Sequence, residues 1–163
     1  MHKLLVNPHR AAAKRTIQTM NSTEPILQSN APIRIRSLAS GSSGNAYLVE
    51  SGDDLVLIDC GIGIRQIQAA LHAWGKTVRD LSAIVLSHEH SDHVRSLASF
   101  LRQRTPIYAT GGTSDALGLS SSCLSTIRYT ESFDIGCMAI TPIATSHDAA
   151  EPCGLLILSL IHI

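Results

Sequence analysis

Hydrophobic positions along the chain change their period several times, which predicts strands alternating with helices. Residues 33–38 alternate apolar and polar side chains like a half-buried strand. Residues 46–50 and 55–58 flank the turn cluster Ser51-Gly52-Asp53-Asp54 and therefore predict a hairpin. The continuous apolar stretch 81–86 is typical of a fully buried strand. Further strands are expected at 107–109, 137–143 and 154–158.

Two apolar stripes have the spacing of a helix. The first covers 64–74 and is stopped by Gly75, and the second begins at Val94 and ends before Pro106. Such stripes ordinarily pack a helix against a sheet. A brief helix is expected over 111–117, with its cap in the Gly-Gly-Thr-Ser run that opens it. Strands alternating with helices predict an α/β layered architecture.

The length of the chain is sufficient for one domain, and its balanced charge excludes a strong electrostatic field around the whole molecule. The chain has 163 residues, enough for a single core. Lys and Arg number 13, as do Asp and Glu, so no net charge attracts nucleic acid from a distance. Six scattered arginines could still form a local basic surface, although a solvated face is the usual role of such residues. They are Arg34, Arg36, Arg65, Arg95, Arg102 and Arg104.

The four cysteines, at 60, 123, 137 and 153, show no Cys-x-x-Cys spacing, so we expect free structural thiols. There is no secretory segment and no apolar stretch long enough to span a bilayer. These features predict a reducing, cytoplasmic environment and no membrane partner. Residues 1–31 show little periodicity and are expected to be a disordered or accessory extension, with Met20 as an alternative start.

The run Ser87-His88-Glu89-His90-Ser91-Asp92-His93 directly follows the expected buried strand and precedes a helix. Imidazole nitrogens and carboxylate oxygens are the ligands that Zn²⁺, Mn²⁺ and Fe²⁺ accept. His88 and His90 can point to one side of an extended segment, while Asp92 and His93 turn toward a neighbouring point. Two nearby histidines can be a coincidence, but this spacing after a buried strand is more specific. The run therefore predicts a site for two adjacent metals.

The same run resembles the signature of the metallo-β-lactamase fold superfamily, and other segments agree with it. Residues 56–61 resemble the first motif of that superfamily, a strand ending in Asp59, and 145–148 resemble the third motif, which supplies His147. Residues 40–47 and 146–154 are specific to a subgroup: they resemble the YycJ/WalJ group of bacterial metallohydrolases, which are regarded as DNA exonucleases. The resemblance implies that 32–157 form the N-terminal part of an αββα sandwich.

The resemblance also implies a ligand set. His88, His90 and His147 would hold the first metal, and Asp92 and His93 would begin the second. Three imidazoles that leave a fourth position open are typical of a catalytic zinc site, where the pKa of a bound water falls to about 7. Asp92 would bind the second metal and orient the nucleophile. Both Zn²⁺ and Mn²⁺ suit a His/Asp ligand set.

Three further features could support the site. Asp59 is expected to orient the ligand loop by hydrogen bonds, with an ordinary strand-end turn as the alternative. Glu89 could be a general base, but a solvent-facing or supporting position is favoured because alternate side chains of an extended stretch point apart. The loop from Ser40 to Asn45 could cradle a phosphate with its backbone amides, or be a tight turn.

The carboxyl end has an unusual sequence. Residues 158–163, Leu-Ser-Leu-Ile-His-Ile, match the in-frame translation of a widely used transposase sequencing adapter, so genuine sequence is expected to stop near Ile157. The superfamily implies a later Asp and a later His that complete the second metal site. His162 is a poor substitute, because it lies in this tail and close behind His147. We therefore expect one tightly bound metal in this chain and two in its parent enzyme.

These features predict a metal-dependent hydrolase that uses a metal-activated water, acts on phosphodiesters and resembles a DNA exonuclease. DNA is thus a candidate partner. The same chemistry would serve a hydrolase of thioesters, lactones or β-lactams, and the ligands do not separate these substrates. A third alternative is a metal-binding remnant that is catalytically inactive because part of the fold is missing.

Overall fold

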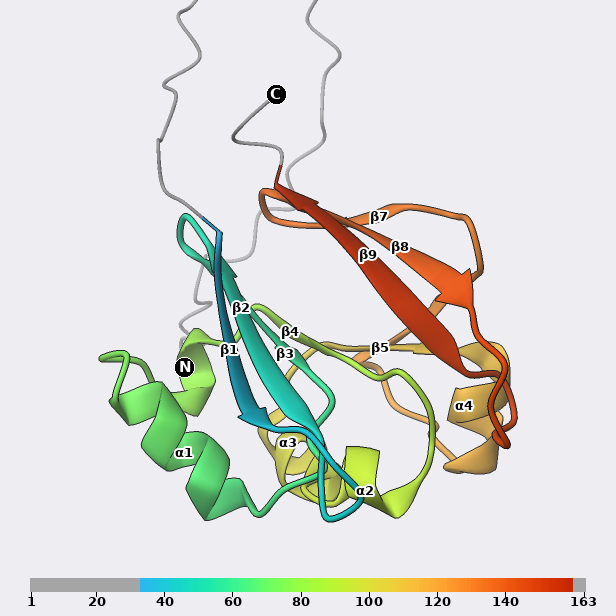
Figure 1. Ribbon diagram of the computed structural model, residues 1–163, viewed down its shortest axis with the longest axis horizontal. Helices are drawn as coiled ribbons and strands as arrows, with labels where there is room; N and C mark the ends of the chain where they lie inside the picture. Colours follow the sequence, from blue (N-terminus) through green and yellow to red (C-terminus); the bar gives the residue numbers. More distant parts are fainter. Residues whose placement is uncertain (1–32, 160–163) are drawn as a thin grey trace, which may run out of the picture.

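The computed structural model describes residues 33–159, which form two β-sheets and several short helices (Figure 1). The expected extension over 1–31 lies outside the described residues. The strands are β1 (Arg34–Ala39), β2 (Ala46–Ser51), β3 (Asp54–Ile58), β4 (Ala83–Val85), β5 (Ile107–Thr110), β6 (Leu124–Ile127), β7 (Phe133–Ile135), β8 (Met138–Ala144) and β9 (Cys153–Ser159). The helices are α1 (Ile64–His72), α2 (Ser91–Val94), α3 (Leu97–Gln103) and α4 (Gly111–Ala116), with a short 3-10 turn, η1, at Val78–Asp80.

The first sheet has the strand order β1-β2-β3-β4-β5-β6. Its first three strands are antiparallel, and the expected hairpin is confirmed by the pairing of Tyr47 with Ile58 and of Ser51 with Asp54. From β3 to β6 the strands run parallel. Parallel neighbours bring the loops at their carboxyl ends to one edge of the sheet, where α/β proteins place their ligands.

One face of this sheet packs against the helices. Leu57, Ile84 and Ile107 from the central strands are fully buried, together with Ile67 of α1 and Phe100 of α3. Full burial of side chains of this size contributes about 1.5–3 kcal/mol each to folding. The apolar stripe expected over 64–74 therefore packs into the hydrophobic core. This core supplies a rigid base for the loops that leave β3 and β4.

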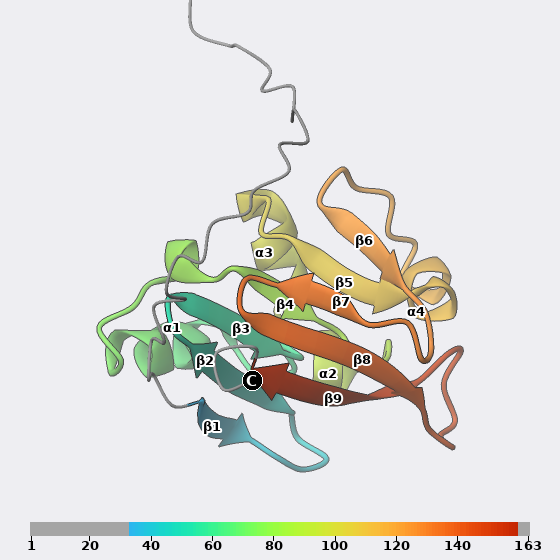
Figure 2. The ribbon, with the colours of Figure 1, turned by 90° about the horizontal axis from the view of Figure 1, so that it is seen from above.

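The second sheet, in the order β7-β8-β9, lies over the other face of the first (Figure 2). Val56 and Val85 of the first sheet meet Met138, Ile140 and Cys153 of the second in a separate core cluster. The layers are thus helix, sheet and sheet. This mixed α/β arrangement confirms the predicted fold class.

The outer face of the second sheet carries apolar side chains. Ile143, Leu156 and Leu158 are about half exposed, and the pairing of β8 with β9 places them on one face. Strand β9 includes Leu158 and Ser159, the first two residues of the expected adapter-derived tail, and the other four lie outside the described residues. Among the helices of residues 33–159, none is long and apolar enough to cross a membrane.

Several elements differ from those expected. Strands β6 and β7 were not predicted, because β6 buries only Ile127 fully and β7 has three residues, so neither shows a clear period. The helix after the histidine run begins at Ser91 and is interrupted at Ser96, whose backbone N–H donates to Cys60 O at 2.9 Å. The cap of α4 is Thr110, one residue before the expected run.

Candidate metal centre

Three imidazoles converge at the carboxyl edge of the first sheet. His88 follows β4, His90 is the residue that precedes α2, and His147 lies on the loop between β8 and β9. One potential ligand nitrogen from each lies within 4.8 Å of the others. The ring centroids are 4.8 Å apart for His88 and His90 and 4.6 Å apart for His88 and His147. The structure therefore brings together the three residues expected to hold a first metal.

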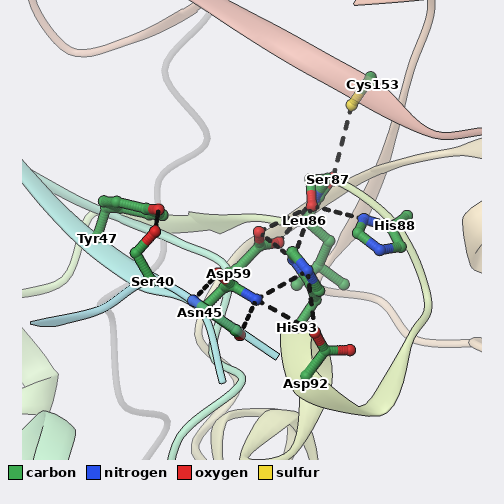
Figure 3. Close-up of polar contacts among 11 residues, drawn as sticks. Ser40, Asn45, Tyr47, Asp59, Leu86, Ser87, His88, Asp92, His93 and Cys153 are labelled. Carbon is green, nitrogen blue, oxygen red and sulfur yellow. Dashed lines mark hydrogen bonds and ion pairs between the residues drawn. The ribbon is translucent and has the colours of Figure 1, made fainter. Parts of the chain in front are cut away.

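The hydrogen bonds around Ser87 indicate which nitrogen of His88 is free to bind (Figure 3). The Ser87 hydroxyl donates to Asp59 Oδ2 at 2.8 Å, because an ionised carboxylate only accepts. The same hydroxyl lies 2.9 Å from His88 Nδ1, which must then be the donor. Nε2 of His88 keeps the lone pair, and it is buried without a hydrogen-bond partner. A buried nitrogen that has no hydrogen-bond partner and lies among other imidazoles is typical of a metal ligand.

Asp59 connects the strand β3 to this network from a buried, left-handed position, with φ of 56°. Its carboxylate accepts the Ser87 backbone N–H at 2.8 Å, the Ser87 hydroxyl at 2.8 Å and His93 Nδ1 at 2.7 Å (Figure 3). Asp tolerates positive φ better than most residues. Asp59 thus contacts the ligand segment through hydrogen bonds, as expected for a residue that orients it.

Asp92 and His93 lie on the first turn of α2, next to the three-imidazole cluster. His93 Nε2 is 3.6 Å from Asp92 Oδ2, and the His93 ring centroid is 3.9 Å from that of His88. The expected second pair is therefore assembled beside the first group, on a helix rather than on the expected loop. Its position follows from α2 beginning at Ser91, directly after His90.

Sequence reasoning missed the part played by Asn45. Its Nδ2 lies 3.2 Å from Asp92 Oδ2 and 3.1 Å from His93 Nε2 (Figure 3). Asn45 also exchanges two hydrogen bonds with the backbone of Gly41, so the loop from Ser40 is a tight turn that directs this side chain into the site. The polar Gly-Ser-Ser-Gly-Asn run was the available signal, but its partners could not be deduced from it.

Two glycines allow the loops around the site to approach closely. Asn45 N donates to Asp92 O at 2.7 Å, and Gly61 N donates to Asn45 O at 2.9 Å. A Cβ placed on Gly61 would lie 1.5 Å from Asp92 O, and one on Gly44 would lie 2.7 Å from Gly61 O. Only glycine fits at Gly61, because any side chain would push the ligand helix away.

The surroundings bias the protonation of the two central imidazoles in opposite directions. Burial, together with the nearby imidazole of His93, lowers the pKa of His88 below its usual value. Burial also opposes the charged form of His93, but the hydrogen bond and charge of Asp59 and the charge of Asp92 outweigh it and raise the pKa of His93. His88 is therefore held in the neutral form that metals require.

The donor set fits a divalent metal at His88, His90 and His147. Neutral imidazoles suit zinc, and the buried unpartnered nitrogen of His88 would gain a bond on metal binding. The structure thus shows an α/β protein whose three candidate ligands come from the segment after β4 in the first sheet and from the β8–β9 loop of the second sheet.

Comparisons with known proteins agree with this description. Residues 39–115 match the family described as the metallo-beta-lactamase superfamily. The exodeoxyribonuclease YycJ of Bacillus anthracis is 31% identical over 124 residues, covering 71% of this chain and 46% of the relative. The exodeoxyribonuclease WalJ of Streptococcus pneumoniae is 32% identical over 123 residues, with the same coverage of 71% and 46%.

A solved structure gives the same fold. The metallo-beta-lactamase fold protein YhfI from Bacillus subtilis superimposes with a TM-score of 0.64 at 20% identity, over 78% of this chain and 58% of that one. The chain belongs to the metallo-beta-lactamase superfamily. It spans about half the length of the curated relatives it matches, 46% in each case.

Proposed function

We propose that the chain carries the first metal-binding part of a metal-dependent hydrolase that cleaves phosphodiesters, with DNA as the substrate. The convergence of His88, His90 and His147, with the His88 Nε2 buried and unpartnered, carries this proposal. The two relatives named exodeoxyribonucleases, at 31% and 32% identity, support the choice of substrate. Because the same chemistry would cleave other esters and amides, the substrate class is the part that most needs a test.

Each residue of the centre has a part in this reaction. When bound, a divalent metal supplies Lewis acidity that lowers the pKa of water and stabilises negative charge developing on the scissile phosphate. The three imidazoles would hold this metal, and Ser87 fixes the ring of His88 through Nδ1. Asp59 fixes the ring of His93 through its own Nδ1. Asp92, with 29% of its side chain exposed, would bind a second metal and orient the nucleophile.

We propose two divalent ions, Zn²⁺ or Mn²⁺, in the parent enzyme and one tightly bound ion in this chain. The first group has three imidazoles already close together. Within residues 33–159, the second group consists of Asp92 and His93, which is fewer ligands than a tight site usually needs. Imidazole favours zinc at the first position, and the carboxylate makes manganese acceptable at the second.

We also propose a cytoplasmic location and local rather than long-range contact with DNA. All four cysteines are free thiols, which suits a reducing compartment. The equal numbers of basic and acidic residues, 13 each, give no long-range attraction. Arg34 pairs with Glu50 at 2.9 Å and lies over the Trp74 ring at 4.4 Å, so it is already occupied.

The test is a substrate comparison with matched variants. The 163-residue chain, loaded with Zn²⁺ or Mn²⁺, is assayed on bis-p-nitrophenyl phosphate, end-labelled DNA, a lactone and a thioester. We expect cleavage of the two phosphodiesters and its loss, by about 100-fold or more, in His88→Ala. His72→Ala removes an exposed imidazole on α1 and should leave activity unchanged. Hydrolysis of only the lactone or thioester would refute the proposal, and metal binding without any hydrolysis would favour the inactive remnant.

A further inference from the structure

Glu89 lies between two of the candidate ligands and makes a contact that its position in the sequence does not suggest. Its Oε1 accepts the backbone N–H of Ala150 at 2.7 Å, although Ala150 lies on the β8–β9 loop of the other sheet. Its Oε2 is buried without a hydrogen-bond partner. The Glu89 carboxylate is thus turned toward the loop that carries His147 and not toward solvent.

That loop is secured mainly at its carboxyl end. Glu151 Oε2 accepts the Gly112 N–H at 2.6 Å, and the Glu151 carbonyl accepts the Thr110 hydroxyl at 2.7 Å. Cys153 N donates to Ser87 O at 2.9 Å. Across 146–150, the bond from Ala150 to Glu89 is the only hydrogen bond to another segment among the described residues.

His147 is exposed, and its ring lies against the rings of His88 and His90 at centroid distances of 4.6 and 5.0 Å. Its position therefore depends on the backbone of its loop. His88 and His90 belong to the segment after β4, whereas His147 belongs to the second sheet. A connection between these two segments is needed for the three nitrogens to share one metal.

We propose that Glu89 is a positioning residue: through its hydrogen bond to Ala150 it holds the His147 loop against the His88 and His90 segment, and so sets the metal affinity of the three-imidazole centre. The proposal rests on the metal site of the proposed function. It assigns Glu89 neither metal ligation nor proton transfer, because its bonded oxygen is engaged with a backbone amide. A charge is not needed for this role, only an acceptor of the right length.

The experiment compares Glu89→Ala, Glu89→Gln and the control Glu131→Ala in the full chain. Affinity for Zn²⁺ is measured by competition with a chromophoric chelator, and the visible spectrum of bound Co²⁺ reports ligand geometry. Glu89→Ala should weaken affinity by about 10- to 100-fold and alter the Co²⁺ spectrum. Glu89→Gln retains an acceptor oxygen and should bind within about threefold of the parent. Glu131 is an exposed carboxylate outside the site, so its variant should match the parent.

The outcomes separate this proposal from the proposed function. If the parent chain binds neither Zn²⁺ nor Co²⁺, the metal site itself is wrong. If the parent binds and Glu89→Ala binds equally well, the positioning role is refuted. A loss in Glu89→Gln as large as in Glu89→Ala would also refute it, since that result requires the charge. If Glu89→Ala does not fold, Glu89→Asn replaces it, because its shorter amide cannot span the distance to Ala150.

Discussion

Replacing Asp59 tests whether one buried carboxylate holds the ligand segment in place. Asp59 is 3% exposed and accepts hydrogen bonds from Ser87 N, from the Ser87 hydroxyl and from His93 Nδ1. Asp59→Ala leaves these donors without a buried acceptor, at about 1–3 kcal/mol each when water cannot replace it. Alanine also pays about 1 kcal/mol at the positive φ of 56°. Because Ser87 and His93 are only half-buried, water offsets part of the loss, and we expect destabilisation by about 3–5 kcal/mol.

The assay is urea denaturation of the metal-free protein, followed by circular dichroism. The matched variant is Asp59→Asn, which keeps the shape of the side chain, tolerates positive φ and retains one oxygen for the Ser87 N–H. We expect it to lose only about 1–2 kcal/mol. Its amide N–H₂ would face His93 Nδ1, which would then have to give up its proton and accept.

The result that refutes this reasoning is simple to recognise. An Asp59→Ala variant within about 1 kcal/mol of the parent would show that the donors find other partners. Equal losses in Asp59→Ala and Asp59→Asn would show that the charge, and not the acceptor geometry, determines the effect.

Five further outcomes are expected. After dialysis the chain should retain at most one equivalent of Zn²⁺ or Mn²⁺, and two equivalents by elemental analysis would contradict this. Burial raises the pKa of the Cys153 thiol to about 12, so iodoacetamide should modify Cys123 and not Cys153 at about pH 8, as read by mass spectrometry; equal labelling would disprove it. The neutral Cys153 thiol adds stability below its ordinary pKa of 9.0, and this contribution should be lost as the pH rises from there to about 12. Gly61→Ala should lower the melting temperature more than Gly75→Ala. An added Cβ meets a carbonyl at 1.5 Å in the first, whereas in the second it meets nothing within 4 Å and the cost is only about 1–2 kcal/mol for a left-handed alanine at φ 68°. Leu156→Glu on the exposed apolar face should reduce aggregation in light scattering, whereas a parent that is already monodisperse would argue against an interaction-prone face.

Much of the framework could be predicted from local sequence. The apolar stretch 81–86 predicted a buried strand, and β4 with its flanking Leu81 and Leu86 is buried as expected. The hairpin of β2 and β3 and the stripe of α1 followed from period and turn residues in the same way. These signals are local, because the period of a strand or helix depends only on which side chains face the core. The order of the candidate ligands along the chain was equally visible.

Elements without such a period could not be predicted. Strand β6 carries two exposed residues between a half-buried and a buried one, and exists because it pairs with β5. The interruption at Ser96 depends on Cys60 and Ile62, whose carbonyl groups accept its backbone N–H and hydroxyl. Neither feature is encoded within its own segment.

By itself, the sequence determined the strands and helices of the core and the residue types that could bind a metal. Only the tertiary structure decided that Asn45 would meet Asp92 and that Glu89 would meet Ala150. Periodicity reports which face of an element is buried, but it contains no information about contacts between loops distant in sequence. Those contacts depend on how the two sheets pack, and a hydrogen bond forms only when that packing brings donor and acceptor within about 3 Å of each other.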